Sequence, residues 1–304
     1  MNGILLINKP QGWTSFDVIA KLRGILHMKR LGHAGTLDPM ATGVLPVFVG
    51  HATKACGILP DPHKAYFAEF RLGKVSDTQD STGDVQETGA DVSQFDRAMI
   101  LEHFPTGHIE QIPPMYSAVK VGGRKLYDLA RQGKEIERKA RPVVVNMADC
   151  TYYNRKTGIG RVIIHCETGT YVRTLIHDMG QSLGCGAVMT GLERYFSSGF
   201  SLKDCHTLEE VQAAADAGTV ETLIIPTAQA FASLPAIHLS AGQSKLYRNG
   251  VKLELARLGT QITDADRYAV FDSGNEFLGT AVTDRENGIL RIERNLCEPK
   301  EAGQ

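Results

Sequence analysis

The chain has 304 residues, 42% of them hydrophobic and 22% charged, and its 33 basic residues nearly balance 34 acidic ones. This composition excludes a wholly disordered, collagen-like or coiled-coil chain, and the length predicts one large domain with a smaller one beside it. The apolar runs fall short of the roughly 20 residues that span a bilayer, and the six cysteines form no Cys-x-x-Cys pair, so we expect a cytoplasmic protein without disulfides or structural zinc.

The first part of the chain predicts strands and helices in alternation. Apolar and alternating runs predict strands over residues 3–8, 44–49 and 66–72. Two helices are expected, over residues 15–26 and about 92–103. The first helix should begin at an N-cap formed by Thr14 or Ser15. Glycine and proline mark residues 31–42 as a loop, and the acidic segment around Gly83 is expected to be an exposed loop.

The second part of the chain begins with an excursion over residues 109–142. It holds Pro113-Pro114, Gly122-Gly123 and a short helix expected near residues 125–132. A hairpin and two helices should follow, over residues 143–153 with 160–166, 171–183 and 208–217. From about residue 235, short β-like runs broken by glycine and asparagine turns predict a small β-rich domain.

Basic residues gather in two segments although the net charge is only −1. Residues 115–141 carry eight basic residues against three acidic ones, and residues 1–60 carry six against two. Such clusters permit a polyanionic partner. A solvated helix face is the alternative interpretation of either cluster.

Residues 32–46 concentrate polar side chains in one loop. The segment contains Asp38, His33, two threonines and three glycines, and reacting side chains are often placed on loops of this kind. A turn at Asp38 and a satisfied buried histidine are the structural alternatives. The glycine spacing fits neither a dinucleotide fingerprint nor a P-loop, and the chain shows no Cys/His ligand cluster. An enzyme here would use carboxylate, arginine and tyrosine, without a metal or cofactor.

Five segments stand in a characteristic order along the chain, at residues 8–15, 32–46, 64–66, 111–120 and 169–173. Together they closely resemble the motifs of the TruB-type tRNA pseudouridine synthases, and they cover the chain to about residue 200. The resemblance implies an α+β pseudouridine synthase fold, with a largely antiparallel mixed sheet and flanking helices. It also implies conversion of uridine 55, in the T loop of tRNA, to pseudouridine. The tail resembles, more weakly, the PUA-like RNA-binding module of bacterial members.

The resemblance implies that Asp38 is the reacting carboxylate. It could attack the anomeric carbon, add to the uracil ring or remove a ribose proton, and these alternatives stay open. Arg173 is implied as its partner, because desolvation would otherwise protonate the carboxylate, and a bidentate pairing would fix its direction. Tyr66 is implied to stack on the target base and to handle the C5 proton. On residue types alone, Arg173 would be an exposed helix residue and Tyr66 a core aromatic.

Three further residues are implied to lie near the uridine. Tyr171 should pack or hydrogen-bond beside the same pocket, and Leu192 should form an apolar wall beneath the uracil. Both could equally be ordinary core residues. Because base flipping empties a place in the RNA stack, His33 is the candidate to occupy that space.

Four basic residues are implied to contact the RNA backbone or to support the pocket. Lys9 belongs to a segment that supports the pocket or a phosphate, with an exposed lysine as the alternative. In the excursion, Arg124, Lys125 and Arg131 are expected to grip phosphates of the T stem and loop.

We therefore expect a catalytic domain over residues 1–232, with the RNA-gripping insertion at about 109–142, and a PUA-like domain over residues 235–304. The expected partner is the T stem-loop of tRNA, with no membrane and no obligate protein partner, and the expected state is a monomer. One rival hypothesis is a non-catalytic tRNA-binding or tRNA-folding protein that uses the same surface. A second is a nucleoside glycosidase, which would need another catalytic acid that no segment pairs with Asp38.

Overall fold

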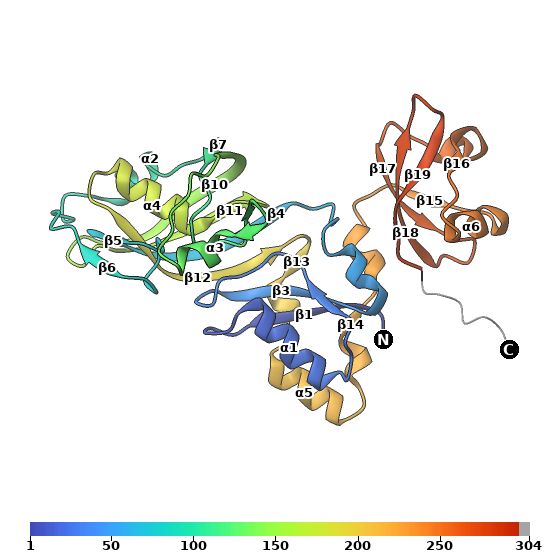
Figure 1. Ribbon diagram of the computed structural model, residues 1–304, viewed down its shortest axis with the longest axis horizontal. Coiled ribbons are helices and arrows are strands. Elements are labelled where there is room, and N and C mark those ends of the chain that lie inside the picture. Colours follow the sequence, from blue (N-terminus) through green and yellow to red (C-terminus); the bar gives the residue numbers. More distant parts are fainter. Residues whose placement is uncertain (298–304) are drawn as a thin grey trace.

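The computed structural model describes residues 1–297, apart from the side chain of Lys125, and within them the chain folds around two separate sheets (Figure 1). The larger sheet is mixed and mostly antiparallel, and β12 runs parallel to β3. Its main strands, in spatial order, are β14 (Ile224–Ile225), β1 (Gly3–Lys9), β3 (Thr42–Val49), β12 (Ala187–Ser197), β4 (His63–Leu72), β11 (Ile159–Glu167), β10 (Arg141–Asn154) and β7 (Gly107–Gln111). Two short strands attach to this path, β2 (Leu31–His33) to β3 and β13 (Phe200–Ser201) to β12.

Two helices, α1 (Ser15–Ile25) and α5 (Leu208–Asp216), cover the part of this sheet that contains β1 and β3 (Figure 1). The expected cap of α1 is confirmed, because Thr14 and Asp17 form a reciprocal capping box. Residues on one side of α1, including Val18 and Leu22, are fully buried against β1, β3 and α5. Burial at a spacing of three or four residues is what fixes an amphipathic helix on a sheet.

The helix α4 (Val172–Ser182) packs on the middle of the sheet, and its first turn carries Arg173. Its apolar side, with Leu175 and Met179, is buried against Ala68 and Phe70 of β4. The period-two alternation expected in β4 is confirmed, since these residues are buried whereas Phe67 is 46% exposed. A further short helix, α2 (Arg97–Glu102), is half as long as expected and begins at an Asp96 N-cap.

Two segments contain hairpins that the sequence did not predict, although the short helix expected in the insertion is confirmed. The acidic segment contains a hairpin, β5 (Lys74–Ser76) with β6 (Val85–Glu87), and the connection between its strands is partly buried rather than exposed. The insertion contains a second hairpin, β8 (Lys120–Val121) with β9 (Arg124–Lys125), followed by the short helix α3 (Leu126–Ala130). Short turns of 3₁₀ helix complete the fold, at η1 (Gly50–Ala55), η2 (Leu202–Asp204), η3 (Val220–Leu223), η4 (Thr227–Phe231), η5 (Leu255–Arg257) and η6 (Gly259–Gln261).

The second sheet is formed by the C-terminal part of the chain, and its strands are β15 (Ala236–His238), β17 (Arg267–Phe271), β18 (Phe277–Asp284), β19 (Ile289–Asn295) and β16 (Leu253–Glu254). It has its own core, in which Tyr247 and Tyr268 are completely buried. Tyr247 belongs to α6 (Ala241–Arg248), a helix that the sequence analysis missed. The separate core supports our proposal of a domain over 235–304, of which residues 298–304 lie outside the described part.

The two sheets meet where η4 and the loop after η1 contact residues of β17 and β18 in the second sheet (Figure 1). The ring of Phe231 stacks on Phe277 at a centroid distance of 5.5 Å. Arg267 donates a hydrogen bond to the carbonyl of Ile58, and Lys54 Nζ donates to Asn295 O at 3.1 Å. Among the described residues, no helix is both long and apolar enough to cross a bilayer.

Candidate active site

The loop between β2 and β3 presents Asp38 at the centre of the large sheet. Its apolar residues Leu37 and Met40 are buried and act as anchors. Leu37 N donates to Ser15 Oγ at 2.9 Å, and Gly12 N donates to Pro39 O at 2.8 Å. The loop is therefore held from both sides of Asp38, whose side chain remains 35% exposed.

Lys9 lies beneath this loop and is completely buried, so the alternative of an exposed lysine is wrong. Its ammonium donates to the carbonyls of Pro10 (2.9 Å), Trp13 (2.6 Å) and Pro39 (3.3 Å). Burial lowers the pKa of Lys9 to about 8, although the nearby charge of Asp38 acts in the opposite direction. Lys9 thus supports the loop from inside.

Arg194, on β12, closes the same loop at its two ends and was not singled out from the sequence. Its side chain is completely buried. Nη2 donates to Gly35 O at 2.7 Å, and Nε donates to Val44 O at 2.9 Å. These residues bracket Asp38, so one guanidinium fixes both the entry to the loop and its exit.

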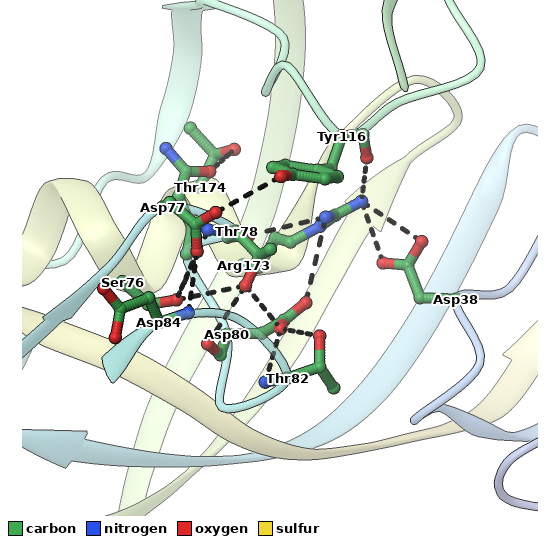
Figure 2. Close-up of polar contacts among 11 residues, drawn as sticks. Asp38, Ser76, Asp77, Thr78, Asp80, Thr82, Asp84, Tyr116, Arg173 and Thr174 are labelled. Atoms are coloured by element: carbon green, nitrogen blue, oxygen red, sulfur yellow. Dashed lines mark hydrogen bonds and ion pairs between the residues drawn. The ribbon is translucent and has the colours of Figure 1, made fainter. Parts of the chain in front are cut away.

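Arg173 meets Asp38, as expected, but in a different geometry from the expected fork (Figure 2). A single nitrogen, Nη2, lies 3.1 Å from each carboxylate oxygen of Asp38. The other terminal nitrogen, Nη1, points to Asp80 Oδ2 at 3.8 Å and to Thr78 O at 3.4 Å. The arginine is 5% exposed, so the interpretation of an exposed helix residue is wrong. The bidentate pairing with Asp38 is also wrong, because the guanidinium is shared between two carboxylates.

Asp80 is the second of these carboxylates, and the sequence analysis placed it in an exposed acidic loop. It is 3% exposed. Its Oδ1 accepts from Thr78 Oγ1 (2.8 Å), Thr82 N (2.9 Å) and Thr82 Oγ1 (2.5 Å) (Figure 2). Such a set of donors stabilises an ionised carboxylate away from water. The sequence signal was weak, because only two threonines distinguish Asp80 from the neighbouring acidic residues.

The charge state of Asp38 reflects opposing influences. Burial is the largest one and raises the pKa of Asp38 above its usual value. The charge of Arg173 lowers this pKa, that of Asp80 raises it, and that of Lys9 lowers it. Burial thus disfavours the charged form of Asp38, and the cations Arg173 and Lys9 favour it.

Tyr66 lies on β4, buried among the residues that anchor the loop. Burial raises the pKa of its phenol to about 12, and the charge of Arg194, directly opposite in the sheet register, acts against this shift. Asp38 is close enough for its charge to act on the phenol as well. Tyr66 is therefore a neutral aromatic ring beside Asp38.

Tyr171 and Leu192 belong to two different elements, the N-cap of α4 and the strand β12. Tyr171 is the N-cap residue of α4, where its backbone N donates to Gln111 Oε1 at 2.8 Å and its O accepts from Gln111 Nε2 at 3.1 Å. This paired contact fixes the start of the helix that carries Arg173. Leu192 is half-buried and lines an open hollow of about 500 Å³ together with Met40 and Phe67.

His33 precedes the loop on β2, where it pairs with Val47. Its ring is half-buried, and burial followed by the charge of Arg194 lowers the pKa of the imidazole. His33 Nδ1 is buried without a hydrogen-bond partner. The side chain is thus a half-buried planar ring whose Nδ1 faces the interior of the protein.

The basic residues of the insertion lie apart from the Asp38 group. Arg124 and Arg131 line a separate hollow of about 660 Å³ with Lys120 and Asp128. Arg131 also stacks over the ring of Tyr127, 5.5 Å from its centroid. The side chain of Lys125 lies outside the described part of the structure. Within residues 1–297, no group of three or more His, Cys, Asp or Glu side chains could hold a metal ion.

Comparison with known proteins bears directly on this arrangement. A protein called tRNA pseudouridine synthase B, from Bacillus subtilis (strain 168), is 42% identical over 308 residues, covering 99% of each chain. Another of the same name, from Pasteurella multocida (strain Pm70), is 36% identical and covers 98% of this chain and 96% of its own. A solved structure described as the crystal structure of a Cbf5-Nop10-Gar1 complex superimposes with a TM-score of 0.73 at 26% identity, covering 97% of this chain and 85% of that one.

Two family descriptions also match the chain. Residues 23–172 match the TruB family pseudouridylate synthase N-terminal domain, and residues 173–232 match the tRNA pseudouridylate synthase B C-terminal domain. The expected resemblance, the α+β fold and the isomerase class are confirmed. This chain belongs to the TruB family of pseudouridylate synthases.

Proposed function

We propose that this chain converts uridine 55, in the T loop of tRNA, to pseudouridine. Curated relatives that match nearly all of the chain carry the name tRNA pseudouridine synthase B. The observation that carries the proposal is the Asp38–Arg173 pair, in which a partly exposed carboxylate lies 3.1 Å from a buried guanidinium nitrogen. This pair provides one reactive anion beside a neutral aromatic ring, with apolar walls around both.

The reaction breaks the bond from ribose C1′ to uracil N1 and forms a bond from C1′ to C5; the C5 proton is lost to solvent and N1 takes up a proton, so the product is an isomer of uridine. Asp38 would supply the nucleophile or base for bond breaking, and its ionised form is the reactive one. Arg173 and Lys9 act against the effect of burial and so keep that form available. The arrangement is compatible with attack on the sugar, addition to the ring or removal of a ribose proton.

The target base must leave the RNA stack before it can reach Asp38, at a cost of about a few kcal/mol. We propose that Tyr66 stacks on the flipped uracil above the apolar surface of Leu192. A phenol with a pKa of about 12 stays protonated near neutral pH, so stacking is better supported than removal of the C5 proton. We propose that the neutral ring of His33 fills the space that the base leaves.

The proposal is tested by incubating the protein with an unmodified tRNA transcript and mapping pseudouridine by a chemical readout at single-nucleotide resolution. A mark at position 55 is expected. Tight binding without any mark would instead favour a non-catalytic tRNA-binding or tRNA-folding protein that uses the same surface.

A first prediction concerns the acidic limb of the pH profile. Because burial raises the pKa of Asp38, the reactive carboxylate should protonate at a higher pH than an ordinary aspartate, for which the pKa is about 3.9. The rate of conversion of saturating tRNA should therefore fall as the pH is lowered through this raised pKa. Single-turnover rates measured from pH 8 downward test this, and a rate that stays constant to the pKa of a free aspartate would contradict it.

A second prediction concerns the basic insertion, which we propose grips the RNA backbone. Replacing Arg124, Lys125 and Arg131 with glutamine should weaken tRNA binding and reduce the log–log salt slope by roughly one unit per lost phosphate contact. Filter binding from low to moderate salt measures the slope. The matched control replaces Lys156 and Lys203, two exposed lysines outside the insertion, and should keep the parent slope. An unchanged slope in the triple variant would make the cluster a solvated surface.

A further inference from the structure

Tyr116 lies where the basic insertion meets the Asp38–Arg173 pair (Figure 2). Its backbone carbonyl accepts a hydrogen bond from Arg173 Nη2 at 2.8 Å, and the same nitrogen donates to Asp38 Oδ1 at 3.1 Å. Because one nitrogen serves both acceptors, the position of the Tyr116 carbonyl helps to set the direction in which the guanidinium faces Asp38.

The carbonyl is held in place by the side chain of the same residue. Tyr116 OH donates to Asp77 Oδ2 at 3.2 Å (Figure 2). Burial, together with the charge of Asp77, raises the pKa of Tyr116, so the phenol stays protonated and can donate. Tyr116 is thus attached at two points, through its carbonyl to α4 and through its hydroxyl to the β5–β6 hairpin.

Asp77 is a fixed anchor for this hydroxyl. Its other oxygen, Oδ1, accepts from Asp84 N at 2.9 Å across the connection between β5 and β6. That connection is itself bonded to β12, where Ser81 N donates to Met189 O at 2.9 Å and Met189 N donates to Gln79 O at 3.2 Å. The anchor is therefore part of a connection that is hydrogen-bonded to β12 and lies outside the insertion.

Tyr116 also adjoins the elements that carry the basic residues. Ser117, the next residue, accepts a backbone hydrogen bond from Tyr127 N at 3.1 Å, and Val119 accepts one from Leu126 N at 2.8 Å. These bonds connect the segment that follows Tyr116 to α3. A displacement of the insertion would therefore act on residues adjacent to the carbonyl that contacts Arg173.

We infer that Tyr116 is a positioning residue: its hydrogen bond to Asp77 keeps its carbonyl on Arg173, so that the guanidinium stays aimed at Asp38 while the insertion holds the RNA. This inference rests on the proposed function and adds a residue that acts through Arg173 without touching the uridine. Its consequence is specific. Loss of the phenol hydroxyl should slow the reaction of bound RNA and leave the affinity for RNA unchanged.

The test compares Tyr116→Phe, Asp77→Ala and Asp77→Asn in the full-length protein, with tRNA affinity and the single-turnover rate measured separately. Tyr116→Phe and Asp77→Ala should each lower the rate about tenfold, the order expected when one hydrogen bond to a charged group is lost, with tRNA affinity within twofold. Because both changes remove the same bond, the double variant should be no slower than either single variant. Asp77→Asn should work nearly as well as the parent, since its oxygen can accept from Asp84 N and its NH₂ can donate to the phenol.

Tyr152→Phe is the matched control, because Tyr152 is 45% exposed and its hydroxyl has no hydrogen-bond partner among the described residues. It should react at the parent rate. Equal rates for the parent and Tyr116→Phe would overturn the inference, as would independent, multiplying effects in the double variant. A loss of affinity with a normal rate for bound RNA would overturn it too, because Tyr116 would then be an RNA contact. A parent that forms no pseudouridine would overturn the proposed function, and this inference with it. An active parent whose Tyr116→Phe variant is equally fast would overturn this inference alone, so the two failures are distinguishable.

Discussion

Replacing Asp38 with asparagine is expected to abolish pseudouridine formation while the affinity for tRNA stays within a few-fold of the parent. The amide keeps the size of the side chain and can still accept a hydrogen bond from Arg173 Nη2, which lies 3.1 Å from the carboxylate in the parent. It has no negative charge, however, and cannot act as the nucleophile or base. The loss should therefore appear in turnover alone, measured as product per bound tRNA under single-turnover conditions.

Asp216→Asn provides the matched control, since Asp216 ends α5 and is exposed. It makes the same chemical change outside the site and should leave turnover unaltered. If Asp38→Asn kept substantial activity, Asp38 would not be the reacting carboxylate.

Arg173 should be the second residue with a large effect, and its two substitutions separate charge from geometry. Lysine keeps one positive charge but offers a single ammonium, whereas the arginine reaches Asp38 with Nη2 and Asp80 with Nη1. Arg173→Lys should therefore lower turnover on the order of 100-fold through misplacement of the carboxylate. Its tRNA affinity should change little, because the guanidinium faces carboxylates and carbonyls and not the exterior.

Arg173→Ala should be worse and should also destabilise the fold. It would leave the buried carboxylate of Asp80 without its cation, and breaking a buried pair of this kind costs about 3 kcal/mol. The Asp38 side of the pair adds less, because 35% of that side chain is exposed to solvent. Urea unfolding measures the loss of stability, and single-turnover rates measure the loss of activity.

Two outcomes would contradict this account of Arg173. A lysine variant that turns over at the parent rate would show that the shared contact with two carboxylates is unimportant. Loss of affinity and turnover in equal proportion would make Arg173 a contact to RNA.

Local patterns in the sequence predicted the elements that depend on nearby residues. The Thr14 cap of α1 and the alternation of β4 rest on spacings of three and two residues, and both are found. The Asp38–Arg173 pair was predictable only by resemblance, because the two residues are 135 positions apart.

β12 was not predicted, although it is the central strand of the site. Its pairing with β4 shifts register twice, between Met189 and Gly191 and between Arg194 and Phe196. Each bulge reverses the faces of the residues that follow, so no simple alternation marks the strand. The short helix α6, which was not predicted, does carry a local signal, the capping box of Ser240 and Gln243.

Buried charge explains the remaining differences. Lys9 and Asp80 are residue types that are rarely buried unless they are paired. Lys9 is buried because three backbone carbonyls satisfy its ammonium, one of them 30 residues away. Asp80 is buried between threonine donors and Arg173. The distant partners, Pro39 for Lys9 and Arg173 for Asp80, leave no mark on the local sequence.

One measurement tests the central claim most directly: the release of tritium from a tRNA that carries the label only at C5 of uridine 55. If Asp38 drives the exchange of the C–N bond for a C–C bond at this uridine, the parent should release tritium to water in the same amount as pseudouridine forms at position 55. Asp38→Asn should bind the same tRNA and release none. A parent that binds the labelled tRNA tightly and releases no tritium, or an asparagine variant that releases it at the parent rate, would contradict the account.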